Sequence, residues 1–160
     1  MKTKIINIEQ SSDGDFTQVC LLTPLGKFYG EAKFNKEKDP LTPSKMMGGR
    51  IAEDRAYIAF YNELARDKRN ELKGIKRLIN SSNPNKSGYM HICNMYYVIR
   101  RELLEIYDIR NSYKRDILNA IDGRKIYLRS RTTDRKEKEE KLKSFGDAIS
   151  ALGQNTSKEQ

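Results

Sequence analysis

Apolar and polar residues alternate through the first third of the chain. Three isoleucines stand between positions 5 and 8, and Phe16–Thr23 is rich in residues that favour strands. Along 27–34 the alternation is regular, so one face of this segment is expected to pack and the other to meet water. Gly30 leaves a gap in the packed face, which favours the close approach of another backbone. We predict a small antiparallel sheet of about three strands within residues 3–34.

A helical period replaces the alternation after residue 44. Ser44 is placed to cap a helix, and an apolar residue then recurs at every seventh position. This spacing puts the apolar side chains on one stripe and predicts a helix over residues 45–79. The stripe residues are Ile51, Ile58, Ala65, Leu72 and Ile79.

A second helix is predicted after a polar loop at 80–88. Apolar residues spaced by three, four and seven continue over 89–122, and Asp122-Gly123 is expected to end the helix. The two helices form an antiparallel hairpin that is far longer than a three-stranded sheet covers. The fold class is therefore α+β, with a domain over 1–123 and a charged, partly helical extension over 124–160. The uncovered helix length predicts a homo-oligomer, with a different partner protein as the alternative.

Composition limits the kind of function. The 160 residues include 31 Lys+Arg and 22 Asp+Glu, and the mean hydropathy is −0.81, so the core is small and the surface highly charged. Two cysteines and one histidine give little material for a metal site or a histidine-based hydrolytic centre. We expect neither an enzyme nor a cofactor. No apolar run reaches membrane-spanning length and no signal core is visible, which predicts a cytoplasmic chain.

The positive charge is concentrated near the C-terminus. Residues 124–143 contain nine basic and four acidic side chains, which accounts for five of the nine net positive charges. Such a segment binds nucleic acid by counterion release, but alternating acids and bases fit a solvated helix equally well. Apolar residues of this region share one side of an expected short helix; they are Leu142, Phe145, Ile149 and Leu152.

Two arginines stand where the helical stripes call for apolar residues. Arg55 lies between Ile51 and Ile58, and Arg110 lies seven residues after Leu103. A desolvated guanidinium needs an anion, and its planar fork fits phosphate or carboxylate. Two such residues on facing helices favour an anion site. The alternative is that each arginine extends to solvent or pairs with a neighbouring acid.

Aromatic and amide side chains on the helices add a possible base-binding function. Seven of the nine tyrosines fall within the two helices, where they either stack on a purine or simply border the core. Asn94 carries an amide suited to an adenine edge or a ribose, although an exposed helical asparagine is common.

Two motifs resemble a known family. Residues 23–33 (TPLGKFYGEAK), Asp39 and residues 48–56 (GGRIAEDRA), followed by two long helices, are similar to the first anti-Thoeris family of phage proteins. Members of that family are sponges that bind the cyclic ADP-ribose isomers made by bacterial TIR enzymes without cleaving them. The resemblance implies an oligomer, either a dimer or a hexamer built from dimers, that acts in the cytoplasm of the infected host.

The resemblance also implies a ligand and site residues. The ligand is a cyclic ADP-ribose isomer (gcADPR), and several members hold CBASS cyclic di- or trinucleotides at a separate site. Carried over by position, Arg55 and Arg110 clamp the phosphates. Residues early in the second helix then contact the base and ribose, and they are Tyr89, Met90, Asn94 and Tyr97. The runner-up hypothesis is a phage accessory protein that binds nucleic acid through its basic C-terminal segment. Hydrolysis of the signal is a third, disfavoured hypothesis.

Overall fold

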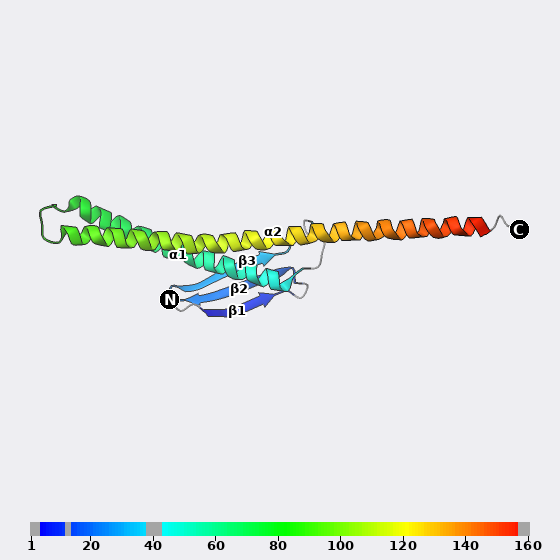
Figure 1. Cartoon of the computed structure of the whole chain (residues 1–160). Coiled ribbons are helices and arrows are strands. Elements are labelled where there is room, and N and C mark those ends of the chain that lie inside the picture. The colour runs from blue at the N-terminus through cyan, green and yellow to red at the C-terminus, as the bar shows by residue number, and fades with distance from the viewer. Residues whose placement is uncertain (1–3, 12–13, 38–42, 157–160) are drawn as a thin grey trace. The chain divides into compact units, whose positions relative to one another are not determined.

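The computed structural model describes residues 4–11, 14–37 and 43–156, with side chains as far as residue 145. Three strands precede two helices (Figure 1), and this α+β order confirms the predicted fold class. The chain divides into two compact units, Met1–Ala120 and Ile121–Gln160. Asp39 and the side chains of Ile149 and Leu152 lie outside the described residues. The elements are β1 Lys4–Gln10, β2 Phe16–Thr23, β3 Gly26–Lys33, α1 Lys45–Ser81 and α2 Tyr89–Thr156.

The three strands form an antiparallel meander in the order β1-β2-β3. The β2–β3 hairpin closes at Gly26, whose φ of 120° suits a residue without a side chain. The predicted alternation on β3 is confirmed, because Gly30 and Ala32 are buried while Tyr29 is exposed. Val19 lies directly opposite Gly30 in the ladder, so both belong to the buried face.

Helix α1 packs on β2 and β3 at unusually short range. A Cβ added to Gly30 would lie 1.9 Å from the Ala52 carbonyl oxygen and 2.3 Å from the Ala56 nitrogen. Both obstacles are helix backbone, so only glycine fits at this position. Phe60 is fully buried in the same layer and meets Phe28 edge to face at 5.6 Å. The close approach predicted from Gly30 is therefore confirmed.

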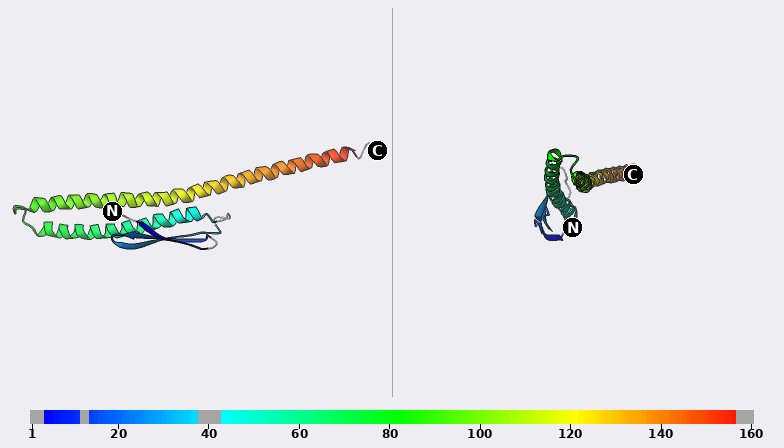
Figure 2. Two further views of the ribbon diagram at one scale, coloured as in Figure 1. Left: turned by 90° about the horizontal axis from the view of Figure 1, so that it is seen from below. Right: turned by 90° about the vertical axis from the view of Figure 1, so that its left-hand side faces the viewer.

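The predicted helical hairpin is present in the first unit. The Ser44 hydroxyl caps α1 by accepting from the Met47 amide at 3.3 Å. Figure 2 shows α1 between the sheet and the first part of α2. Ala65 packs against Leu103 and Ile106 of α2 in a small apolar cluster.

The prediction that Asp122-Gly123 ends the second helix is wrong, because α2 continues to Thr156. Gly123 has no positive φ, so it does not adopt a left-handed helix cap. A glycine inside a helix costs only about 1 kcal/mol relative to alanine, and the arginines, lysines and glutamates that follow favour helix. The Lys125 ammonium also pairs with Asp122 at 2.8 Å across this point.

Replacing Gly30 with alanine is expected to destabilise the protein by about 2 to 3 kcal/mol, because helix backbone occupies the space of the new methyl group. Gly74→Ala is the matched control. A Cβ there meets nothing within 4 Å, so this change is expected to stabilise α1 by up to about 1 kcal/mol. Urea denaturation followed by circular dichroism measures both. Equal stabilities for the two variants would contradict the close approach.

Candidate functional site

Arg110 lies in the seam between α1 and α2 with an incomplete set of partners. Its guanidinium donates to the Asn62 amide oxygen on α1 at 3.3 Å and to the Asn111 amide oxygen at 3.1 Å, and it lies 4.9 Å from the Tyr107 ring centroid. The Nε–H is buried and has no partner among the described residues. Within the same part of the chain no carboxylate forms an ion pair with it. Both hydrogen-bond partners are neutral amides, so the positive charge of the guanidinium is solvated by them but not neutralised.

Three tyrosines stack beside this arginine. Tyr113, one turn after Arg110, is parallel to Tyr57 of α1, with ring centroids 4.9 Å apart and an interplanar angle of 4°. The ring centroid of Tyr61 lies 5.9 Å from that of Tyr113. Burial is the main cause that raises the pKa of Tyr61 and of Tyr113, so both phenols keep their protons at neutral pH and are able to donate hydrogen bonds.

A buried acid lies at the sheet end of the same seam. Asp54 is buried, and its Oδ2 atom has no hydrogen-bond partner within the described chain. Burial raises the pKa of the Asp54 carboxyl, the nearby Asp116 raises it further, and Arg50 opposes these effects. The seam therefore holds two buried polar atoms without a partner among the described residues, Oδ2 of Asp54 and Nε of the half-buried Arg110.

Arg55 has a different environment from Arg110. Its side chain is exposed, and Nη1 donates to the main-chain carbonyl of Glu31 on β3. Arg110 instead faces Asn62, which is seven residues or about 10 Å further along α1. The structure therefore places Arg55 at the edge between helix and sheet and Arg110 in the seam between helices, rather than in one guanidinium pair.

The predicted base-binding residues lie together at the start of α2. Met90, Asn94 and Tyr97 are exposed, and Tyr89 is half-buried beside Cys93, whose side chain raises the pKa of the Tyr89 phenol. Tyr97 meets Tyr96 edge to face at 5.9 Å. This set offers open aromatic and amide groups next to the loop that joins the helices.

The helix separates these groups from Arg110 within one chain. Tyr97 and Arg110 are 13 residues apart on α2, which corresponds to about 20 Å along the axis. A cyclic ADP-ribose molecule is too small to bridge this distance. The predicted residues therefore form separate groups in a single protomer.

Asn62 is the residue of this site that the sequence analysis missed. It stands seven residues after Arg55 and seven before Arg69, and all three side chains are exposed, so Asn62 belongs to a polar row along α1 and not to its apolar stripe. The sequence pattern therefore carries no signal that singles it out. The packing of α2 on α1 brings its amide oxygen within 3.3 Å of the Arg110 guanidinium.

Other kinds of site find little support in the described part of the chain. Its His, Cys, Asp and Glu side chains form no group of three or more that is suited to a metal ion. None of its helices has an apolar stretch long enough to cross a membrane.

Comparison of the chain with protein-family models, curated proteins and solved structures found no match.

The Asp54→Asn variant is expected to be more stable than the wild type at pH 7. Because the folded-state pKa of Asp54 is raised, the ionised carboxyl opposes folding, and stability falls as the pH rises from the ordinary value of 3.8 through the folded-state value. The gain from Asp54→Asn is thus largest above this window and shrinks as the pH falls through it. Thermal melts at pH 7, 5 and 3.5 test the sign. A stability gain of the variant over wild type that is smaller at pH 7 than at pH 3.5 would contradict the raised pKa of Asp54.

Proposed function

We propose that this protein binds and sequesters cyclic ADP-ribose-type signalling nucleotides, with gcADPR as the leading ligand, and does not cleave them. In this role it is a phage anti-defence protein that acts in the host cytoplasm against TIR enzymes of Thoeris systems. The proposal draws its ligand from the motif resemblance and its binding chemistry from the seam. CBASS cyclic di- or trinucleotides are the ligands proposed for a separate site.

The observation that carries the proposal is the state of Arg110. A half-buried guanidinium with two amide partners, a buried free N–H and no paired carboxylate in the described chain is a site prepared for an anion. Phosphate offers oxygens in the geometry that the guanidinium fork prefers. Among the described residues no carboxylate is bonded to this arginine, so an incoming phosphate has none of these to displace.

The surrounding side chains suit the rest of a nucleotide. Protonated Tyr61 and Tyr113 supply hydroxyl donors in the adjoining turn, and Asn62 and Asn111 supply amides for ribose or base edges. None of these groups is a strong nucleophile or a general base near neutral pH. The arrangement favours holding a ligand over reacting with it.

Sequestration requires tight binding and therefore more than one arginine contact. Competition with a defence effector calls for nanomolar affinity, equivalent to about −12 kcal/mol. One charge-assisted contact contributes only about 1.5 to 3 kcal/mol. We therefore propose that the ligand is enclosed between protomers of a homo-oligomer, which adds contacts and excludes water.

Replacing Arg110 with glutamine is expected to weaken cyclic ADP-ribose binding by about 10- to 100-fold, because the phosphate loses its charged donor. Arg77→Gln, an exposed change elsewhere on α1, is the matched control and leaves the affinity unchanged. Isothermal titration calorimetry with purified gcADPR measures both. Equal affinities for Arg110→Gln and wild type would remove Arg110 from the site, and no heat with any variant would reject this ligand.

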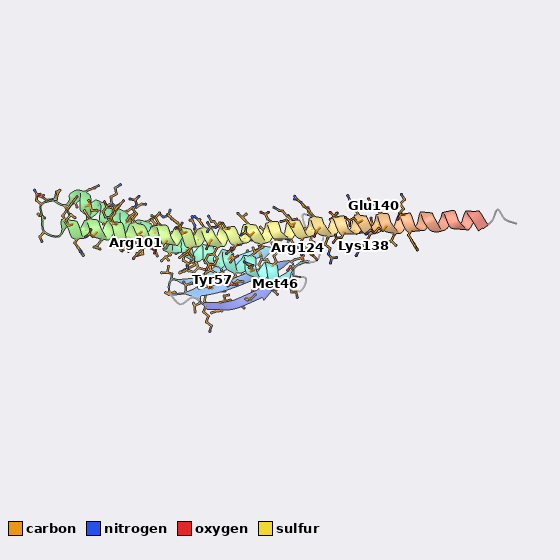
Figure 3. The ribbon with its side chains drawn as sticks, in the orientation of Figure 1. Met46, Tyr57, Arg101, Arg124, Lys138 and Glu140 are labelled. Atoms are coloured by element: carbon orange, nitrogen blue, oxygen red, sulfur yellow. The ribbon has the colours of Figure 1, made fainter. Side chains whose placement is uncertain are left out.

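A second candidate function, nucleic-acid binding, is favoured by the helix that follows residue 120. There Tyr127 lies between Arg124 and Arg131, whose guanidinium carbons are 5.8 and 5.7 Å from the ring centroid. Charged side chains such as Lys138 and Glu140 project from this helix (Figure 3). An aromatic ring flanked by cations suits stacking on a base beside phosphates. Ion pairs such as Arg135–Glu139 at 2.8 Å reduce the free positive charge.

The two candidates respond differently to charge removal. Neutralising Arg129, Arg131, Lys136 and Lys138 to glutamine in the full-length protein is expected to abolish salt-dependent binding to single-stranded DNA if the second candidate is right. The same variant is expected to keep its affinity for gcADPR, because these residues lie outside the seam. Fluorescence anisotropy at 50 and 200 mM salt provides the measurement. Unchanged DNA binding by this variant would reject the second candidate.

A further inference from the structure

An exposed apolar stripe follows the first part of α2. Apolar side chains stand at intervals of seven residues and are largely open to solvent: Met90 is 69% exposed, Tyr97 65%, Leu104 54% and Leu118 59%. Asn111 occupies the remaining position of the series. Residues seven apart lie two turns apart on nearly the same side of a helix, so these side chains give α2 a second, narrow apolar row. We call these five residues the α2 stripe.

The stripe is distinct from the face that contacts α1. That face is formed by Ile99, Leu103 and Ile106, which are buried. At about 100° per residue, Leu104 points well away from Leu103 around the helix axis. All five stripe residues belong to the first compact unit, and they extend over about 42 Å. The surface therefore remains available after the hairpin has formed.

The stripe is symmetric about its central residue. Leu104 lies 14 residues from both Met90 and Leu118, and 7 from both Tyr97 and Asn111. An antiparallel second copy centred on Leu104 thus places Met90 opposite Leu118 and Tyr97 opposite Asn111. A two-fold axis through Leu104 produces this register, and it pairs the apolar residues Met90 and Leu118 at both ends of an isologous contact.

Charges beside the stripe select the antiparallel direction. Arg101 lies three residues before Leu104 and Asp108 four residues after it, on the same flank. Figure 3 shows Arg101 on the first part of α2. Antiparallel pairing brings each Arg101 level with Asp108 of the second copy, twice per dimer. Arg101 makes only a long 3.9 Å contact with Glu105, and Asp108 has no ion pair among the described residues. In a parallel pair, Arg100 and Arg101 of one copy would lie level with Arg100 and Arg101 of the other, and these positive charges would repel one another.

We propose that the α2 stripe binds the same stripe of a second copy of this chain, antiparallel and centred on Leu104. Tyr97 of one copy then lies opposite Asn111 of the other, next to the arginine of the seam. The dimer brings the residues at the start of α2 toward the Arg110 region, although about 20 Å separates them within one chain. This last consequence rests on the proposed function, whereas the interface itself does not.

Disulfide trapping of the full-length protein tests the register. In a Cys93→Ser background, Leu104→Cys is expected to cross-link to itself because it lies on the two-fold axis. Tyr97→Cys and Asn111→Cys are each expected to stay monomeric on denaturing gels, and the double variant to form a covalent dimer. Leu78→Cys, an equally exposed position on α1, is the control and does not cross-link. Cross-linking of Tyr97→Cys alone, or no dimer with Leu104→Cys, would overturn the register.

Charge reversal tests the interface without any cross-link. Arg101→Asp and Asp108→Arg are each expected to raise the dimer dissociation constant by about tenfold or more, and the two changes together to restore it. Arg77→Asp, on α1, is expected to leave the dimer unchanged, and circular dichroism verifies that every variant is folded. Sedimentation equilibrium without nucleotide gives the constants, so failure here is independent of ligand binding. A double variant that dissociates as readily as either single variant would overturn the proposal.

Discussion

The contact of α1 with β3 at Gly30 is the constraint on which the rest of this protein depends. The Ala52 carbonyl and the Ala56 amide occupy the space of a side chain at Gly30, so this side of α1 lies directly against the sheet. In this arrangement Phe60 is buried against the strands, while Tyr57, Tyr61 and Asn62 contact α2. A missing Cβ in a strand thus determines which side chains line the helical seam.

The seam combines apolar packing with polar groups that are only partly paired. Ala65, Leu103 and Ile106 form its apolar part, and the Lys68 ammonium joins the helices through Glu102 at 2.8 Å. Beyond these contacts the seam carries Arg110, which no carboxylate of the described residues pairs with, and Asp54, whose pKa is raised by burial. The buried Asp54 carboxyl and the buried Nε–H of Arg110 each cost free energy to remove from water, and this cost is the physical basis of the proposed anion site.

Much of the fold follows from the sequence because its signals are local. Alternation predicts β3, Ser44 predicts the start of α1, and the off-pattern position of Arg110 predicts its place between helices. The end assigned to the second helix at Gly123 was wrong, since one glycine costs too little to stop a helix of strong helix formers. The bond from Arg55 to the Glu31 carbonyl was beyond prediction, because it depends on how closely α1 approaches β3. Sequence pattern identifies the helices that carry the predicted ligand residues, but helix rise keeps Tyr97 far from Arg110 in one chain.

The measurement that tests the central claim most directly is recovery of the bound ligand. The full-length protein is incubated with a cyclic ADP-ribose mixture made by a TIR enzyme, separated from free nucleotide by filtration and heat-denatured, and the released material is identified by mass spectrometry. Sequestration predicts release of an intact cyclic ADP-ribose isomer in a fixed ratio to protein. Denatured protein without nucleotide, or release of a cleaved product, would contradict the account.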